Sequence, residues 1–160
     1  MPDTYKFIAD ENVGKLGRYL RRLGFDTALF EGGGDREMVK QALAEGRVIL
    51  TRDTHIEKYG AAVKGRVRVV TFAADDPGEQ LKQVIDTLEL SGAAQPFTLC
   101  LECNNPLAET SEENVAERVP PYVLKTQKHY MECPACRRVY WRGSHWRAMQ
   151  EGFGVLCEQG

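Results

Sequence analysis

The stretch VILTRD, Val48–Asp53, is an apolar run that leads directly into polar and charged residues. Its aliphatic residues predict a buried strand, yet a hydroxyl, a cation and a carboxylate follow with no glycine or proline in between. Two further apolar runs end in the same way, FIAD at Asp10 and VTFAADD at Asp75 and Asp76. Because ligands of open parallel sheets bind beyond the carboxyl ends of the strands, these acids predict a site at one edge of a sheet.

Helical patterns separate these strands. In NVGKLGRYLRRLGFD the apolar residues recur every three or four positions, which predicts a helix ending near Gly24. DREMVKQALAEG predicts a second helix, with Asp35 at its N-cap and Gly46 at its end. THIEKYGAAVKG predicts a short helix, and a longer one enters through Pro77. This alternation predicts an α/β fold in which helices flank a parallel sheet.

The composition is typical of a soluble globular protein with one ordinary domain or two small ones. The chain has 160 residues, an apolar fraction of 42%, a charged fraction of 28% and a formal net charge of −2. No apolar run approaches the roughly 18 residues that a membrane span needs, and the N-terminus shows no secretory signal. We therefore expect a cytoplasmic protein without a membrane partner, whose cysteines are thiols or metal ligands.

All the cysteines lie in the second part of the chain, after the segment LSGAAQPF. This segment predicts a boundary between a domain of residues 1–95 and a domain of residues 96–160. Two Cys-x-x-Cys pairs, CLEC and CPAC, are separated by 29 residues. One such pair alone would suit a redox site, whereas two pairs predict a four-thiolate zinc site. The predicted zinc ligands are Cys100, Cys103, Cys133 and Cys136.

The long gap between the two cysteine pairs must hold an extended loop or an extra hairpin. Within it, YVLKT reads as a strand. Cys157 matches neither pair by its spacing, so we interpret it as a buried or terminal thiol.

The acids at the strand ends predict a second metal site. Like charges gathered in a crevice repel one another, and a divalent cation removes that cost. Oxygen ligands of this kind suit Mg²⁺ or Mn²⁺. The alternative is that each aspartate only caps a helix or turn, because its short side chain accepts hydrogen bonds from free backbone N–H groups. The predicted ligands are Asp10, Asp35, Asp53 and Asp76.

Basic residues near these acids, and arginines interleaved with aromatic residues after the last cysteine, predict contacts with RNA. Cations can hold a phosphate backbone that the acids repel, and aromatic rings stack on unpaired bases. The alternative interpretations are a solvated helix face in the first part and structural packing by the aromatic residues in the second. The predicted RNA-binding residues are Lys15, Arg18, Arg22, Arg52, Arg142, Trp146 and Arg147.

Several of these segments together resemble the Mut-seven C-terminal RNase domain family. The similarity runs from about Lys6 to Met149 and rests on FIADENVGKLGRYLRRLGFDT, ILTRD and EQLKQVI in the first part. In the second part it rests on CLECNNPL, VPPYV and CPACRRVYWRGSHW. The ADEN start departs from the family's usual aspartate followed by small residues and methionine, and it is closer to PIN-like toxin-type proteins.

The resemblance implies a PIN-like domain, with a parallel sheet flanked by helices, followed by a small β-rich zinc ribbon. It also implies a ribonuclease that uses Mg²⁺ or Mn²⁺ to cut single-stranded RNA. Asp10, Asp35 and Asp53 match the family's acids, Asp76 matches the last acid better than Asp75 does, and the four cysteines match the ribbon ligands.

Two other functions stay open at this point. A non-catalytic RNA- or protein-binding module would keep the ribbon but would have no use for the acids. A toxin-like nuclease would be controlled by a regulatory protein partner. The sequence also leaves open whether the chain forms a homo-oligomer.

Overall fold

The alternation of strands and helices expected from the sequence is present in the computed structural model, which describes residues 5–143. These residues fall into two units, and the change from the first to the second comes after Leu90. Arg22–Gly24 group with the second unit. The predicted domain limits, 1–95 and 96–160, stay a prediction.

The first unit contains a parallel sheet of four strands. They are β1 (Lys6–Ala9), β2 (Thr27–Leu29), β3 (Arg47–Thr51) and β4 (Val69–Thr71). Their order across the sheet is β2-β1-β3-β4, and every neighbouring pair is parallel. The fold class predicted from the sequence is therefore confirmed.

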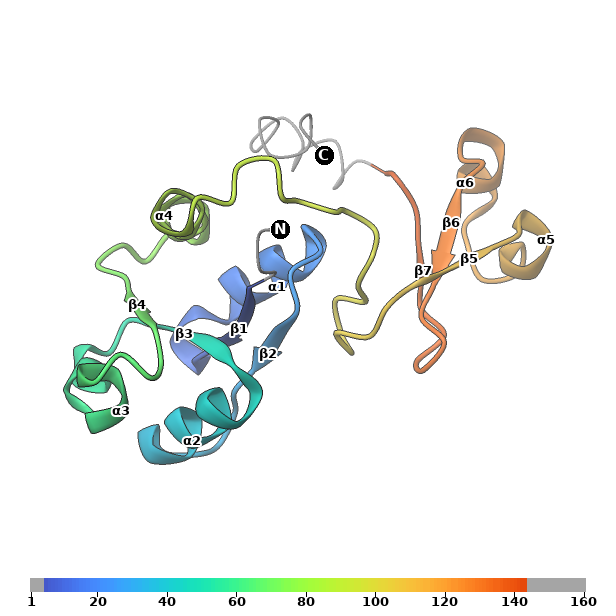
Figure 1. Ribbon diagram of the computed structural model, residues 1–160. Helices are drawn as coiled ribbons and strands as arrows, with labels where there is room; N and C mark the ends of the chain where they lie inside the picture. Colours follow the sequence, from blue (N-terminus) through green and yellow to red (C-terminus); the bar gives the residue numbers. More distant parts are fainter. Residues whose placement is uncertain (1–4, 144–160) are drawn as a thin grey trace. The chain divides into compact units, whose positions relative to one another are not determined.

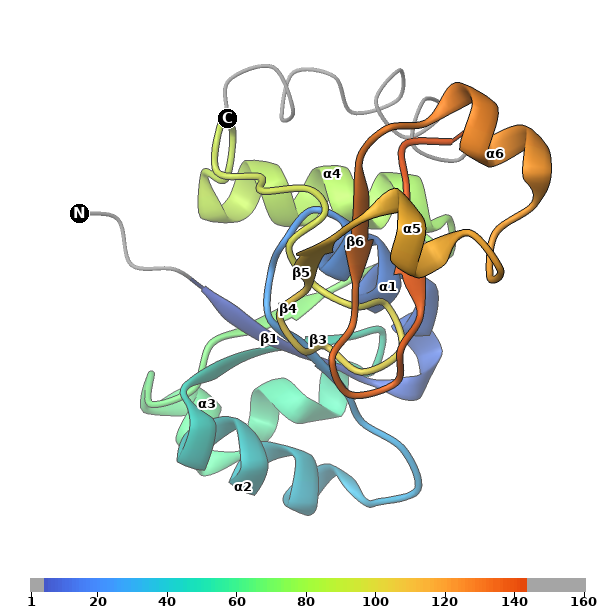
Figure 2. The ribbon, with the colours of Figure 1, turned by 90° about the vertical axis from the view of Figure 1, so that its right-hand side faces the viewer.

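Helices cover both faces of this sheet (Figures 1 and 2). One face carries α1 (Gly14–Arg22) and α4 (Pro77–Leu88), and the other carries α2 (Asp35–Glu45) and α3 (Gly60–Val63). Two 3-10 helices, η1 (Glu11–Val13) and η2 (Thr54–Lys58), follow β1 and β3 directly. Both 3-10 helices therefore begin where the predicted acids lie.

The helix limits agree with the sequence signals except at the start of α2. Gly46 closes α2 in the left-handed conformation, as expected, and Pro77 opens α4. Asp35 was expected as the N-cap of α2, but Gly34 takes that place and Asp35 is the first helical residue. Three consecutive glycines precede Asp35, and glycine is itself an acceptable N-cap, so the helix can begin one residue later than predicted.

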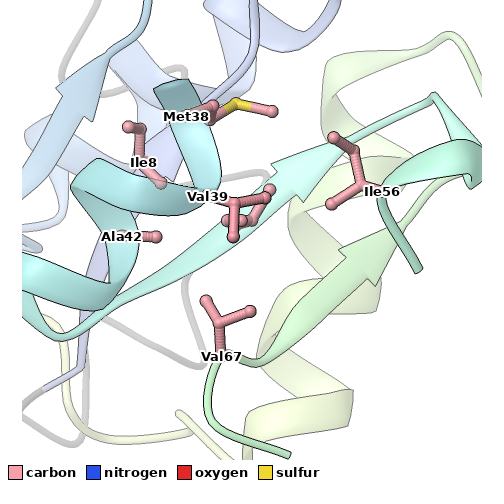
Figure 3. Close-up of a cluster of buried hydrophobic side chains, with 7 residues drawn as sticks. Ile8, Met38, Val39, Ala42, Ile56 and Val67 are labelled. Carbon is pink, nitrogen blue, oxygen red and sulfur yellow. The ribbon is translucent and has the colours of Figure 1, made fainter. Parts of the chain in front are cut away.

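The face of the sheet under α2 is closed by a cluster of aliphatic side chains (Figure 3). Ile8 of β1 and Ile49 of β3 are register partners, and both are fully buried in this cluster. The remaining members come from α2, η2 and the approach to β4: Met38, Val39, Ala42, Ile56 and Val67. Each of the isoleucine, valine and methionine side chains contributes roughly 1.5–3 kcal/mol by leaving water, so this cluster holds α2 and its first residue in place.

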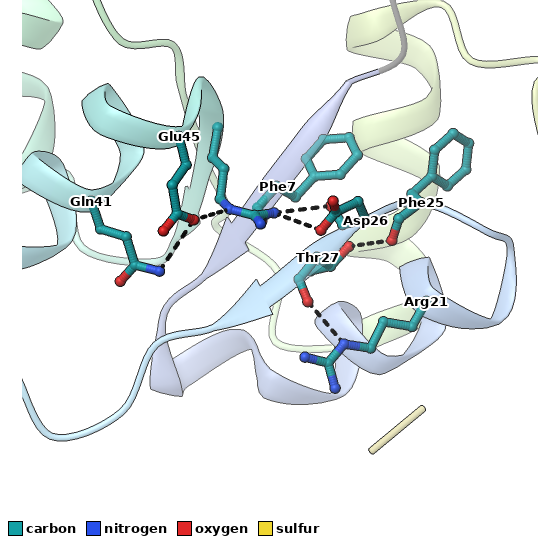
Figure 4. A network of polar contacts seen from close by, with 8 residues as sticks. Phe7, Arg21, Phe25, Asp26, Thr27, Gln41 and Glu45 are labelled. Atoms are coloured by element: carbon teal, nitrogen blue, oxygen red, sulfur yellow. Dashed lines mark hydrogen bonds and ion pairs between the residues drawn. The ribbon is translucent and has the colours of Figure 1, made fainter. Parts of the chain in front are cut away.

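The start of β3 is fixed by Arg47 (Figure 4). Its Nη1 donates to the carbonyl of Phe7 at 3.0 Å and to Asp26 Oδ1 at 2.8 Å, and its Nε donates to Glu45 Oε1 at 2.5 Å. This polar network ties β3 to β1 and to the chain before β2. It lies at the amino ends of the strands, whereas the predicted acids lie at the carboxyl ends.

The second unit holds a small antiparallel sheet with two short helices inserted (Figure 1). Its strands are β5 (Ala108–Thr110), β6 (Tyr130–Glu132) and β7 (Val139–Tyr140), and its helices are α5 (Glu112–Val115) and α6 (Pro121–Thr126). Four buried side chains form its core, against which Leu124, Val139 and Trp141 pack: Val115, Val119, Val123 and Tyr130. This is the small β-rich part that the family resemblance implied.

The prediction that YVLKT forms a strand is wrong, because these residues belong to α6. Pro120 is the extended N-cap and Pro121 is at the first helical position, where its fixed backbone angle and missing N–H favour a helix start. This start signal outweighs the β-branched residues that follow.

Candidate functional site

The two strands at the centre of the parallel sheet, β1 and β3, mark the point where the chain changes direction across the sheet. From β1 the chain moves outward to β2, and it then crosses to β3 on the other side of β1. Such switch points leave a crevice beyond the carboxyl ends of the strands, where ligands of open α/β sheets bind. Asp10 follows β1 directly and Asp53 lies two residues beyond β3, so both acids border this crevice.

A buried hydroxyl links the two strand ends. Thr51, the last residue of β3, donates from Oγ1 to Asp10 Oδ2 at 2.8 Å and accepts the backbone N–H of Asp53 at 3.0 Å. Thr51 was not among the site residues predicted from the sequence. The signal that could have found it is a hydroxyl at the end of a fully apolar strand, since a buried hydroxyl needs a hydrogen-bond partner.

Both strand-end acids also act as caps, as the structural alternative proposed. Asp10 Oδ1 accepts the N–H of Glu11 at 2.8 Å at the start of η1. Asp53 Oδ1 accepts the N–H of His55 at 2.8 Å at the start of η2. These bonds fix the direction of each carboxylate and still leave oxygen lone pairs for another ligand.

Asp35 is different, because no cap hydrogen bond accounts for its position. It is half-buried at the first position of α2. Burial, followed by the negative charges of Asp53 and Asp10 and by a hydrogen bond with Asp53, raises the pKa of Asp35, and His55 partly opposes this. Asp35 therefore interacts with two of the other predicted acids, Asp10 and Asp53, although the three come from different parts of the chain.

A divalent cation at these acids stays a prediction, because in residues 5–143 only the four cysteines bring three or more possible metal-ligand atoms within 4.8 Å of one another. Like charges that are partly removed from water repel one another, and a cation with oxygen ligands relieves that repulsion. His55, which was not predicted, also lies close enough to influence Asp35. Its signal in the sequence is its place two residues after Asp53.

The fourth predicted acid, Asp76, makes no hydrogen bond with these three acids within residues 5–143. Asp76 is exposed and caps α4, with Oδ2 accepting the N–H of Glu79 at 3.0 Å. Its rival Asp75 is also exposed. Among residues 5–143, no hydrogen bond joins either of them to the three interacting acids, so the fourth ligand stays a prediction.

One of the predicted basic residues, Arg18, lies near one of the acids. Arg18 and Asp10 line the same pocket of about 410 Å³, together with Phe30 at the end of β2. Lys15 is exposed one turn before Arg18, and Arg22 is half-buried at the end of α1. The exposed Arg52 donates from Nη2 to the carbonyl of Ala73 at 3.3 Å.

The four cysteines of the second unit converge as their spacing predicted. Their sulfur atoms all lie within 4.8 Å of one another, and Cys100 and Cys133 are buried. Around a tetrahedral zinc with bonds of about 2.3 Å, sulfur atoms are about 3.8 Å apart. Cys100 Sγ and Cys136 Sγ are 3.6 Å apart, so the cluster is a metal-binding site of a size compatible with zinc.

Tyr140 supports this cluster from β7. Its hydroxyl lies 3.1 Å from Cys100 Sγ and accepts the N–H of Leu101 at 3.1 Å. Burial raises the pKa of Cys100, but the Tyr140 hydroxyl and the nearby backbone N–H groups outweigh burial and lower it to about 7. A thiol with this pKa gives up its proton readily, which metal binding requires.

The segment after the last cysteine is described only as far as residue 143. Arg142 lies with its guanidinium 5.7 Å from the ring centroid of Phe97, and Trp141 packs against the core of the second unit. Trp146 and Arg147, which were predicted to bind RNA, lie outside the described residues, as does Cys157. Within residues 5–143, every helix is too short or too polar to span a bilayer.

Comparison with known proteins gives one match. A family model described as the Mut7-C RNAse domain matches residues 5–153, which is nearly the whole chain. No curated protein and no solved structure gives a significant match.

Proposed function

The chain belongs to the Mut7-C RNAse domain family, and from this premise we propose that it is a metal-dependent ribonuclease that cleaves phosphodiester bonds of single-stranded RNA. The observation that supports this most is Asp35, whose carboxylate is partly buried and repelled by those of Asp53 and Asp10. A protein gains no stability from such an arrangement without a cation, so the cluster is best understood as a ligand set.

In this proposal Asp10, Asp35 and Asp53 hold Mg²⁺ or Mn²⁺, with Asp76 as a further ligand. When bound, the cation supplies positive charge opposite the phosphate and promotes attack by water on the phosphorus. Thr51 keeps the carboxylate of Asp10 in one orientation through its hydrogen bond. This hydrogen bond matters because groups that hydrogen-bond to metal ligands affect how tightly those ligands bind the metal.

The basic residues near the crevice hold the RNA backbone. Arg18 shares a pocket with Asp10, and Arg52 and Lys15 are exposed nearby in the sequence. Their charges offset the repulsion between the phosphates and the acids that no cation neutralises.

The four cysteines hold one structural zinc ion. All four positions of a tetrahedral site are filled by protein sulfur, as in structural rather than catalytic zinc sites. The ribbon formed in this way contributes to RNA binding through Arg142, Trp146 and Arg147.

Cleavage of short single-stranded RNAs in the presence of Mn²⁺ tests the proposal. Asp35→Asn and Asp53→Asn should each lower the cleavage rate by more than the roughly 10- to 100-fold that changes around a metal site cause. Asp86→Asn removes an exposed charge from α4 and should cut at the wild-type rate. Wild-type cleavage by both site variants would reject the ribonuclease mechanism. Absent cleavage by the wild type with retained RNA binding would favour a non-catalytic module.

A further inference from the structure

The two cysteine pairs form turns with matching backbone geometry but different residues at the strained position. After Cys103 comes Asn104 with φ 61°, and after Cys136 comes Arg137 with φ 69°. The N–H of Asn104 donates to the carbonyl of Cys100 at 2.9 Å, and the N–H of Arg137 donates to that of Cys133 at 2.8 Å. The two turns can therefore be compared directly.

Asparagine is a common residue in the left-handed conformation, whereas arginine is not. The first turn has asparagine at the position of positive φ. The second turn has arginine there, and its side chain makes the same positive φ more costly in free energy. Strain of this kind at a residue suggests that its side chain serves another purpose. The ion pair from Arg137 Nε to Glu132 Oε2 at 3.2 Å does not account for an arginine at this position. The arginine side chain is 69% exposed, and Arg118 already pairs with the same carboxylate.

Arg137 lines a pocket of about 360 Å³ on the second unit, which is within the usual size range of small-ligand sites of about 300–1,000 Å³. The pocket is rich in arginine and aromatic side chains. Its lining includes Arg118, Arg137, Arg138, Tyr140, Trp141 and one acid, Glu102. Three arginines against Glu102 and the paired Glu132 leave a net charge of +1, so the pocket favours an anion.

Arg118 forms a fixed wall of this pocket. Its Nη1 donates to Glu132 Oε2 at 2.5 Å and to the carbonyl of Arg137 at 2.9 Å, and its Nη2 donates to the carbonyl of Asn114 at 3.0 Å. Arg138 is exposed, and its side chain makes no ion pair or hydrogen bond with any residue in the described part of the chain. The guanidinium of Arg138 is therefore available to a ligand.

Trp141 completes the pocket with an aromatic surface. It packs against the core that contains Val115 and Tyr130, and it is only partly buried there. Its indole N–H has no hydrogen-bond partner in residues 5–143. A Cβ on Gly143 would lie 3.0 Å from Trp141 Nε1, so the glycine lets the chain pass close to the ring. One indole, held by the core and open to the pocket, is suited to stacking on a base.

We propose that this pocket binds one nucleotide of single-stranded RNA. Arg137 and Arg138 contact its phosphate, and Trp141 stacks on its base. Glu102 disfavours a second phosphate at its side of the pocket. The inference rests on the RNA substrate of the proposed function, but it uses none of the acids at the parallel sheet.

Binding of a labelled oligouridylate with 2′-O-methyl groups, measured by fluorescence anisotropy without added Mg²⁺ or Mn²⁺, tests the proposal on the intact zinc-loaded protein. Arg137→Asn and Arg138→Ala should each weaken binding about fivefold at about 0.1 M salt and lower the salt slope by about 0.7. Trp141→Leu should weaken binding about tenfold. Lys125→Ala removes an exposed charge from α6, outside the pocket, and should bind like the wild type.

Arg137→Asn carries a second readout. Since asparagine suits the left-handed turn, its zinc content and melting temperature should equal or exceed those of the wild type while its RNA affinity falls. Unchanged oligonucleotide affinity in both Arg137→Asn and Arg138→Ala would overturn the proposal, whatever Trp141→Leu does. The proposal would also be overturned if a polyglutamate peptide bound to this pocket without competing with the oligonucleotide, because the oligonucleotide would then bind elsewhere. The ribonuclease proposal is tested separately, because the methylated oligonucleotide reports binding alone.

Discussion

At the scale of single residues, the position of Asp35 defines the candidate site. The carboxylates of Asp10 and Asp53 accept backbone hydrogen bonds, which would explain an aspartate at these positions in any α/β protein. The carboxylate of Asp35 makes no such cap hydrogen bond. Its raised pKa comes from burial and from two neighbouring carboxylates, so its charge is unfavourable in the folded protein without a cation. Repulsion at the partly buried Asp35 favours a ligand set more than three acids that are each satisfied alone would.

Removal of this charge should stabilise the protein that contains zinc but no added Mg²⁺ or Mn²⁺. Because the folded-state pKa of Asp35 is raised, its ionised form opposes folding at neutral pH. We expect Asp35→Asn to increase the free energy of unfolding by roughly 0.5–1 kcal/mol in thermal melts. Added Mn²⁺ should raise the melting temperature of the wild type but have much less effect on the variant. A variant that is less stable without Mn²⁺ would contradict this account of Asp35.

Substitutions of Thr51 test whether its hydroxyl positions the carboxylate of Asp10. Thr51→Val has nearly the same shape but leaves the N–H of Asp53 without its partner and removes the donor to Asp10 Oδ2, while the bond from Glu11 to Asp10 Oδ1 remains. We expect a loss of stability of about 1–2 kcal/mol and a loss of Mn²⁺ affinity of about 10- to 100-fold. Thr51→Ser keeps the hydroxyl and should restore most of the Mn²⁺ affinity. If Thr51→Val binds Mn²⁺ as the wild type does, the hydroxyl only stabilises the fold.

At the scale of elements, the sheet order explains why acids distant in the sequence meet. The chain changes direction between β1 and β3, and the acid-bearing turns follow these two strands. The helix α2 begins at Asp35 and packs over both strands through Ile8 and Ile49. The strands and most helices could be predicted from apolar periodicity and from capping residues, because these signals are local.

Other features could not be predicted in the same way. The helix α6 was misread because the β-branched residues of YVLKT were given more weight than the two prolines before them. The fourth acid could not be decided, since Asp75 and Asp76 are adjacent and the choice depends on side-chain direction, which sequence spacing does not give. The hydroxyl of Thr51 was missed for the same reason, because its partners lie on other elements.

The network at the amino ends of the strands gives a pH-dependent prediction. The hydrogen bond from Arg47 lowers the pKa of Glu45 below its ordinary value of 4.5, although burial opposes this. A lowered folded-state pKa stabilises the protein above pH 4.5, and this stabilisation is lost as the pH falls through the folded-state pKa. Since Glu45 is 42% exposed, Glu45→Gln should cost at most about 0.5 kcal/mol at pH 7. Denaturant titrations should show the difference from the wild type shrinking as the pH falls below 4.5; a growing difference would contradict the assignment.

We expect the second unit to depend on a metal for stability, because its own hydrophobic core is small. Four buried side chains hold it together besides the cysteine cluster, and structural zinc supplies folding free energy in such units. Metal analysis should find about one zinc per chain in protein purified without chelator. Removal of zinc by a chelator should expose Trp141 to solvent, seen as a red shift of its fluorescence in a Trp146→Phe background. Protein without zinc and with unchanged fluorescence would contradict a structural zinc site.

At the scale of the whole molecule, the two candidate sites lie in different units. The carboxylates at the parallel sheet have the chemistry to hold a cation for phosphodiester cleavage. The arginines and Trp141 of the ribbon have the chemistry to hold a nucleotide. Because different residues carry the two functions, we predict that cation binding and RNA binding can be lost independently, with additive effects as at independent sites.

The double variant Asp53→Asn with Arg138→Ala tests this division. Asp53→Asn alone should lower Mn²⁺ affinity, measured by calorimetry, without weakening the binding of the methylated oligonucleotide, because one negative charge fewer cannot repel RNA. Arg138→Ala alone should weaken oligonucleotide binding and leave Mn²⁺ affinity unchanged. The double variant should show both losses, each within about 0.5 kcal/mol of its value in the single variant. A larger deviation would mean that the ribbon and the carboxylates form one coupled site, and the ribbon pocket would then have to be reinterpreted as part of the nuclease centre.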